Sequence, residues 1–300
     1  MTAKSVTVDV LCLGHACYDL TFSVNKHPES DEKIFAEDLV GCGGGPAANA
    51  AVAVSRLGLK AAFAGYLGAD PYGEMHLQEF IQHQVNTDLI VRGDSPTPLS
   101  TVIVKPDGKR ALINYKGATK VLTDSVIDFS LLQAKAILLD GHEPNLSLAL
   151  VKLARQLNIP TVLDAGSLHE GTEKLMDKVD YLVASEKFAC QFAGDVKTAL
   201  ERLAKLSPAV VITLGEKGLI WQRGEQQGEL AAIAVKAIDT TGAGDAFHGA
   251  FAAAVAKNMD WLDILAYSSA AGTLCCTKIG ARQGLPWLQQ HSQLLARPIL

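Results

Sequence analysis

The sequence predicts one α/β domain over residues 1–300, in which helices cover both faces of a mainly parallel sheet and a small β-sheet forms a lid. Strand-like and helix-like segments alternate from about residue 136 onward, as in a chain of βαβ units. Two β-like segments, within about 15–40 and 97–116, are more polar than the core strands. Because they are separated in sequence, they predict a discontinuous lid over the strand ends.

The first half of the chain begins with a β-rich strand at 8–13 that ends at Gly14. Asp19 follows at the place where open α/β sheets position ligand groups. An apolar helix at 50–58 ends at Gly58, a plausible residue for a C-cap. The pattern then predicts a buried strand at 61–68 and a helix at 70–83, with Pro71 near the helix start.

Two β-like runs, 101–104 and 110–115, flank a Pro-Asp-Gly turn signal at 106–108 and predict a hairpin. Beyond it the chain predicts strands at 136–139, 161–164, 181–183 and 209–213, and helices at 147–157, 197–206 and 261–276.

The composition is typical of a soluble globular protein with a large aliphatic core: 48% of the residues are hydrophobic and 6% are aromatic. A net charge of −5 and the absence of a Lys/Arg cluster argue against nucleic-acid binding. The apolar run near the N-terminus is short, and no stretch is long enough to span a bilayer, so we expect no signal peptide, no membrane partner and a cytoplasmic location. The six cysteines form no CxxC pair, which favours buried free thiols over a zinc site.

The stretch at 238–249 contains the chemistry around which the chain is organised. Gly242 and Gly244 precede an alanine-rich helix, where glycine lets a backbone approach a ligand closely and unpaired N–H groups attract an anion. Asp245 follows at once. A carboxylate beside a bound phosphate is unfavourable unless it acts, for example as the base that deprotonates an attacking hydroxyl. The alternative is a simple helix N-cap.

Two motifs in register identify the chain as similar to the ribokinase-like (PfkB) family of carbohydrate and nucleoside kinases. The first is Gly-Gly-Gly-Pro-Ala-Ala-Asn at 43–49, and the second is Asp-Thr-Thr-Gly-Ala-Gly-Asp at 239–245. The segment at 211–218 between them also agrees. The patterns are closest to ribokinases, fructokinases and sulfofructose kinases. The resemblance implies a three-layer αβα fold and ATP-dependent phosphorylation of the primary hydroxyl of a ribose- or fructose-type sugar.

The same resemblance implies roles for individual residues. Asp245 matches the catalytic base, and Gly242, Ala243 and Gly244 match the anion hole. Residues that match the sugar site are Asp19, Lys33, Gly43, Gly44, Asn49, Asn114 and Glu143. Residues that match the nucleotide site are Glu186, Thr213, Gly215, Gly218, Thr241, Gly244 and Ser269.

The implied cofactors are ATP and Mg²⁺, with K⁺ as a further candidate. A monovalent cation would lie at Asp239, Gly280 and Gly284. Relatives also lead us to expect a homodimer through the lid strands, whose exposed edges invite pairing.

Departures from the family pattern leave the acceptor open. Gly45-Pro46 stands where ribokinases carry lysine, and Ser185-Glu186 stands in the family's Asn-x-x-Glu element. A nucleoside kinase, a sulfofructose kinase and a non-catalytic sugar-sensing homologue therefore remain alternatives. A charged sugar would need a cation, for which the candidates are Lys33, Arg110 and His142.

Several of these residues also have a purely structural interpretation. Asp19 and Asn49 are typical caps of a turn and of a helix. Ordinary solvated charges need no ligand, and this alternative applies to Lys33, Glu143 and Glu186. His248 is expected to be a packed neighbour of the site rather than a proton carrier, and Arg282 to tie down a C-terminal loop.

Overall fold

The computed structural model describes residues 5–106 and 110–296 and contains a nine-stranded central sheet. In spatial order its strands are β15 (Gln226–Leu230), β14 (Leu219–Arg223), β13 (Ala209–Thr213), β12 (Tyr181–Ser185), β11 (Thr161–Ala165), β10 (Ala136–Leu139), β2 (Val10–Leu13), β5 (Ala61–Gly68) and β6 (Asn86–Gly93). All neighbours from β13 to β6 pair in parallel. β14 and β15 add an antiparallel edge. The sheet is therefore mainly parallel, as predicted.

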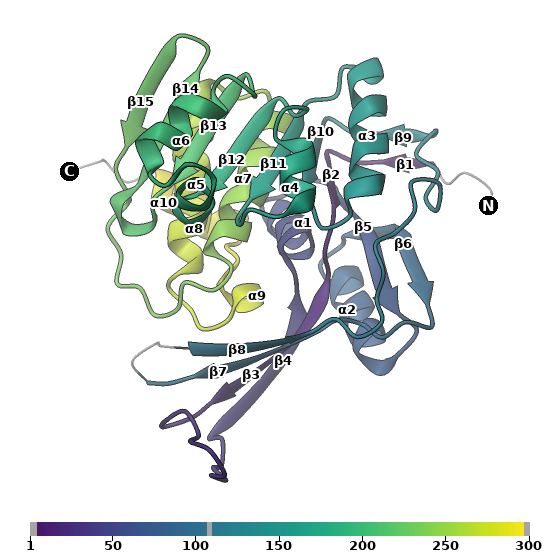
Figure 1. The fold of residues 1–300 in the computed structure, drawn as a ribbon, viewed down its shortest axis with the longest axis vertical. Helices are drawn as coiled ribbons and strands as arrows, with labels where there is room; N and C mark the ends of the chain where they lie inside the picture. Colours follow the sequence, from purple (N-terminus) through teal and green to yellow (C-terminus); the bar gives the residue numbers. More distant parts are fainter. Residues whose placement is uncertain (1–4, 107–109, 297–300) are drawn as a thin grey trace.

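Helices cover both faces of this sheet (Figure 1). Side chains alternate along β2, so that Val10 and Cys12 belong to one apolar core and Leu11 and Leu13 to the other. The first core is covered by α1 (Pro46–Arg56), α2 (Pro71–Gln82), α7 (Ala243–Ala256) and α8 (Trp261–Cys275). The second is covered by α3 (Pro144–Leu157), α4 (Glu170–Leu175), α5 (Glu186–Ala193) and α6 (Val196–Leu203). The three-layer αβα prediction is confirmed.

The remaining short elements lie at the periphery. They are α9 (Ala281–Gly284), α10 (Leu288–Leu295), the 3₁₀ turn η1 (Gly215–Lys217) and the parallel pair of β1 (Val6–Thr7) with β9 (Leu132–Gln133). Across residues 5–106 and 110–296, none of the helices has the length and apolarity needed to cross a bilayer. In the same ranges the cysteines are all free thiols, but Cys190 is exposed rather than buried.

A second sheet has the order β4-β3-β7-β8 and projects below the body of the molecule between α9 and α2 in Figure 1. Its strands are β3 (Cys17–Ser23), β4 (Asp38–Gly44), β7 (Leu99–Val104) and β8 (Arg110–Tyr115). β3 pairs with β7 in parallel, and the outer pairs are antiparallel. We call these four strands the small sheet. The turn expected at 106–108 falls largely outside the described residues.

Two predicted helix starts were wrong in the same way. α1 begins at Pro46 rather than at residue 50, and α3 begins at Pro144 rather than at residue 147. Proline suits the first helical position, because it has no N–H to leave unpaired and its φ is already helical. Asn49 therefore lies inside α1, and its interpretation as a helix cap was wrong.

Candidate active site

A left-handed glycine starts α7 at the carboxyl end of the central strands. Gly242 is the N-cap residue with φ 79°, and a Cβ there would lie 2.5 Å from that of Ala281. The amide of Ala243 donates to the Thr240 carbonyl at 3.2 Å. In the described parts of the chain, the amides of Gly244 and Asp245 have no acceptor. The turn therefore presents unpaired donors at the positive end of a helix, which suits an anion.

Asp245 lies in the first turn of α7 and is not the N-cap. Its Oδ2 accepts a hydrogen bond from Asn49 Nδ2 in α1 at 2.7 Å. Removal from water raises the pKa of Asp245 to about 7, the nearby Asp164 carboxylate adds to the rise, and the Asn49 hydrogen bond opposes it. A carboxyl that titrates near neutral pH can accept a proton efficiently.

Asp19 on β3 faces the glycine-rich end of β4. A Cβ on Gly44 would lie 2.2 Å from Asp19 Oδ2, so only glycine leaves room for this carboxylate. Cys17 Sγ donates to Asp19 Oδ1 at 3.2 Å. Burial raises the pKa of Asp19, although the Cys17 hydrogen bond and Arg282 work against that rise. Asp19 and Asp245 are close enough for their charges to interact.

The backbone of Gly43 is already engaged by buried side chains. Its amide donates to Glu79 of α2, and its carbonyl accepts from Arg282 Nε at 3.0 Å. Arg282 is 2% exposed and also contacts His76 Nε2 at 3.1 Å. Arg282 therefore connects α9 to the glycine-rich strand β4, a connection that the sequence interpretation of a simple loop anchor missed.

Three histidines follow three neighbouring strands, and sequence reasoning did not recognise them as a group. His15 follows β2, His142 follows β10 and His169 follows β11. The ring centroid of His142 lies 5.2 Å from that of His15 and 4.7 Å from that of His169. Asp140 fixes this edge of the sheet, because it accepts from the amides of His15 (2.7 Å), His142 (2.9 Å) and Ala47 (3.2 Å).

Glu143 lies beside this histidine group, at the N-cap position of α3. It is 7% exposed, and its Oε2 accepts from the Leu122 amide at 2.7 Å, so it is not a surface charge. Burial raises the pKa of Glu143 to about 7. The carboxyl is therefore placed near the strand ends, with one oxygen already used.

The residues expected to bind nucleotide lie around β12 and β13. Thr213 ends β13 and donates to the Ala184 carbonyl at 3.3 Å. Glu186 is the first residue of α5, and its carboxylate lies 3.4 Å from Lys217 Nζ. Gly215 begins η1 and Gly218 follows it, both with positive φ. Ser269 lies half-buried on α8, the helix that packs against α7.

The residues expected to bind a cation and strand β8 of the small sheet come together at Asp239. Its Oδ2 accepts from the Gly280 amide at 2.8 Å, and its Oδ1 accepts from the Thr241 amide at 2.9 Å. Arg110 of β8 reaches across, 3.4 Å from Asp239 Oδ1, and also donates to Thr241 Oγ1. Gly284 donates to the Gly280 carbonyl at 3.0 Å within α9. The segments at 239–241 and 280–284 are thus adjacent, and strand β8 contacts the first of them through Arg110.

Two expected sugar residues lie on the small sheet or on its loop, and Asn114 shares a cross-strand row with Ser100 and Asp19. Lys33 lies in the exposed loop between β3 and β4, with Nζ 5.7 Å from the Phe35 ring centroid. Asn114 is exposed on β8, opposite Ser100.

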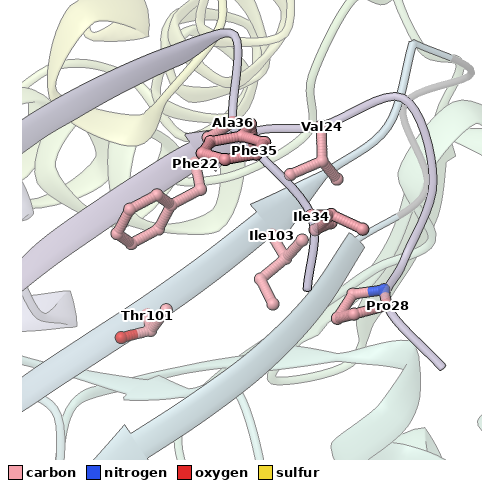
Figure 2. A pocket seen from close by; sticks show the side chains of 8 residues that line it. All are labelled: Phe22, Val24, Pro28, Ile34, Phe35, Ala36, Thr101 and Ile103. Atoms are coloured by element: carbon pink, nitrogen blue, oxygen red, sulfur yellow. The ribbon is translucent and has the colours of Figure 1, made fainter. Parts of the chain in front are cut away.

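The loop between β3 and β4 covers an apolar pocket of about 310 Å³ on the small sheet (Figure 2). Eight residues line it: Phe22, Val24, Pro28, Ile34, Phe35, Ala36, Thr101 and Ile103. It has no carboxyl or histidine, so it is not a catalytic pocket.

Comparison with known proteins decides the family. The family model described as pfkB family carbohydrate kinase matches residues 8–288. The chain belongs to the pfkB family of carbohydrate kinases. A ribokinase of Lactococcus lactis is 30% identical over 288 residues, which cover 94% of this chain and 95% of the relative. A probable fructokinase-5 of Arabidopsis thaliana is 29% identical over 277 residues, 81% of this chain and 85% of the relative.

Solved structures of pfkB-type kinases have the same fold. The structure of Arabidopsis thaliana ribokinase complexed with ribose and ATP superposes with a TM-score of 0.86 at 25% identity, and it covers 98% of this chain and 100% of that one. This pfkB protein is a carbohydrate kinase of the ribokinase and fructokinase group, as the sequence motifs predicted.

Proposed function

We propose that this chain transfers the γ-phosphoryl group of ATP to the primary hydroxyl of a ribose- or fructose-type sugar, with Asp245 as general base. The observation that carries this proposal is the position of Asp245. Its carboxylate lies in the first turn of α7, where the backbone amides of Gly244 and of Asp245 itself are unpaired in the described residues, and Asn49 donates a hydrogen bond to it. A base and an anion site are therefore within one helical turn of each other.

The proposed reaction is a direct displacement. Asp245 takes the proton of the sugar hydroxyl as its oxygen attacks the γ-phosphorus, and the bond from that phosphorus to the β,γ-bridging oxygen breaks to release ADP. The amides at the start of α7 stabilise the negative charge that develops on the transferring group. Asp19 and Asn49 would orient the sugar, because each can bind two neighbouring hydroxyls. Glu143 would contact the sugar from the β10 side.

The nucleotide would extend from this turn toward β13. Thr213, Gly215, Gly218 and Ser269 would contact the nucleoside, and Thr241 and Gly244 the phosphates. Mg²⁺ bound to ATP would neutralise phosphate charge, with Glu186 as the nearest proposed partner. The proposed monovalent-cation site is Asp239, Gly280 and Gly284, where K⁺ would stabilise the loops beside the anion site; both Asp239 oxygens already accept hydrogen bonds, and Arg110 lies 3.4 Å from Oδ1.

The small sheet would act as the lid. Water must be excluded during phosphoryl transfer, because it competes with the sugar as acceptor. Arg110 already connects strand β8 to Asp239 and Thr241 beside the anion turn. This contact supports closure of the sheet over the site.

A coupled assay of ADP release tests the proposal. The acceptor panel contains ribose, fructose, sulfofructose, adenosine and pseudouridine, each with and without K⁺. Turnover with ribose or fructose is expected. A preference for adenosine or pseudouridine would instead indicate a nucleoside kinase, and a preference for sulfofructose would indicate a sulfofructose kinase. No ADP release with any acceptor would contradict the proposal and favour a non-catalytic sugar sensor.

A further inference from the structure

His248 lies one turn beyond the anion site on α7, and it is 3% exposed. Its Nδ1 lies 2.6 Å from the Gly244 carbonyl oxygen and 3.3 Å from Asp164 Oδ2. Its Nε2 lies 3.1 Å from the Val183 carbonyl oxygen. One imidazole thus joins α7 to the ends of two central strands, β11 and β12.

Every polar partner of this ring is a hydrogen-bond acceptor. A carbonyl oxygen cannot donate, and Asp164 has no proton to offer when it is ionised. A neutral imidazole carries one N–H, so it would direct a lone pair at either the Gly244 or the Val183 carbonyl. Only a doubly protonated ring donates to both, and buried polar groups are rarely left unpaired.

A doubly protonated His248 ring would have a counter-ion in contact with it. Asp164 at the end of β11 is 5% exposed, and its carboxylate is the acidic group nearest to the ring. Asp245 lies three residues before His248 on the same helix, and its charge interacts with both members of the pair. Burial raises the pKa of Asp164, and the positive charge of His248 opposes that rise; Asp140 and His142 at the end of β10 act on it with opposite signs.

We propose that His248 and Asp164 form a buried ion pair that fixes the first turn of α7 and sets the charge of Asp245. The imidazolium holds the Gly244 carbonyl, which belongs to the residue whose amide faces the anion site. Its positive charge favours the ionised form of Asp245, while Asp164 disfavours it. The two residues are positioning residues, and their effects on Asp245 have opposite signs.

This role rests on the proposed function only because it concerns the same base, and its test does not require turnover. Carbon-13 NMR of labelled aspartate carboxyls follows the titration of Asp245 in the ligand-free protein, with Asp245→Asn identifying the signal. We expect His248→Asn to move this titration to higher pH, because the positive charge is lost while a donor remains. Asp164→Asn should move it to lower pH, because a like charge is lost.

A matched control is His291→Asn. His291 is also fully buried and contacts a backbone carbonyl, that of Tyr267 at 2.8 Å, but it lies on α10 outside the site. The His291→Asn variant should leave the Asp245 titration unchanged. Shifts of the two test variants in the same direction, or no shift in either, would overturn the ion-pair role.

A measurement on the unmodified protein does not depend on whether the variants fold. Nitrogen-15 NMR distinguishes a doubly protonated imidazole from either neutral tautomer, and the ion pair requires a proton on both nitrogens of His248. A neutral ring there would refute the proposal even if the kinase is active. Conversely, the expected NMR result with no ADP release would contradict only the proposed function.

Discussion

Asn49 Nδ2 lies 2.7 Å from Asp245 Oδ2, and this hydrogen bond connects the fourth residue of α1 to the first turn of α7. Asn49 is 2% exposed, and its Oδ1 has no hydrogen-bond partner in the described residues. The two glycine-led helices of the sequence thus meet at one carboxylate.

Asp245→Asn should lower kcat by roughly 10²- to 10⁴-fold, the range that general-base catalysis contributes, and leave ATP affinity nearly unchanged. Asparagine keeps the shape and can still accept from Asn49, but it cannot take a proton. Steady-state kinetics and calorimetric ATP binding measure the two effects. Retained turnover would falsify the base assignment.

The value of kcat/KM for the sugar should fall as the pH is lowered below neutral. The base acts as carboxylate, and burial raises the pKa of Asp245 to about 7, so kcat/KM for the sugar should rise with pH and level off above that value. A pH profile from 5 to 9 measures this. A profile already flat between pH 5 and 7 would contradict it.

Asp245→Asn should also stabilise the fold at high pH. The pKa of Asp245 rises from 3.8 to about 7 on folding, so between these values the native state binds more protons than the unfolded state. Wild-type stability therefore falls as pH rises through this window, while asparagine does not titrate. Since each pKa unit corresponds to about 1.4 kcal/mol, the variant should gain a few kcal/mol at pH 8 and much less at pH 4. Denaturant unfolding at both pH values tests the difference, and an equal effect at both would argue against it.

Gly44→Ala should raise KM for the sugar by roughly 10-fold or more and change KM for ATP little. The new Cβ would overlap Asp19 Oδ2, so the carboxylate must move away from its position. Gly93→Ala, at the end of β6, is the control, because its Cβ would meet the Tyr66 side chain, 3.2 Å from the hydroxyl oxygen and 3.3 Å from Cε2. Equal kinetics for the two variants would remove Asp19 from the sugar site.

The small sheet should mediate a homodimer. Ile113 and Tyr115 on β8 are 63% and 54% exposed, Phe35 in the loop between β3 and β4 is 83% exposed, and β4 and β8 are edge strands. Light scattering should show a dimer that Ile113→Glu converts to a monomer. Leu262→Glu, at 64% exposure on α8, is the matched control and should remain dimeric. A monomeric wild type would exclude the lid interface.

Much of the fold was predictable because its signals are local. Alternating apolar strands and alanine-rich helices predicted the layers, and the β-like runs at 101–104 and 110–115 predicted the antiparallel pair of β7 and β8. The antiparallel edge of β14 and β15 was not predicted, because strand direction depends on which neighbour a strand reaches and not on its own pattern. The starts of α1 and α3 were misplaced because Pro46 and Pro144 were not interpreted as first helical residues.

The sequence by itself determined the chemical elements of the site: glycines that precede a helix, a carboxylate one turn in, and the family to which these motifs belong. Only the tertiary structure decided what surrounds that carboxylate. Asn49 is 196 positions from Asp245, and Asp164 and His248 meet only because β11 ends beside α7. The proton affinity of a carboxyl depends on its burial and on charges within a few ångströms, and packing between distant segments sets both.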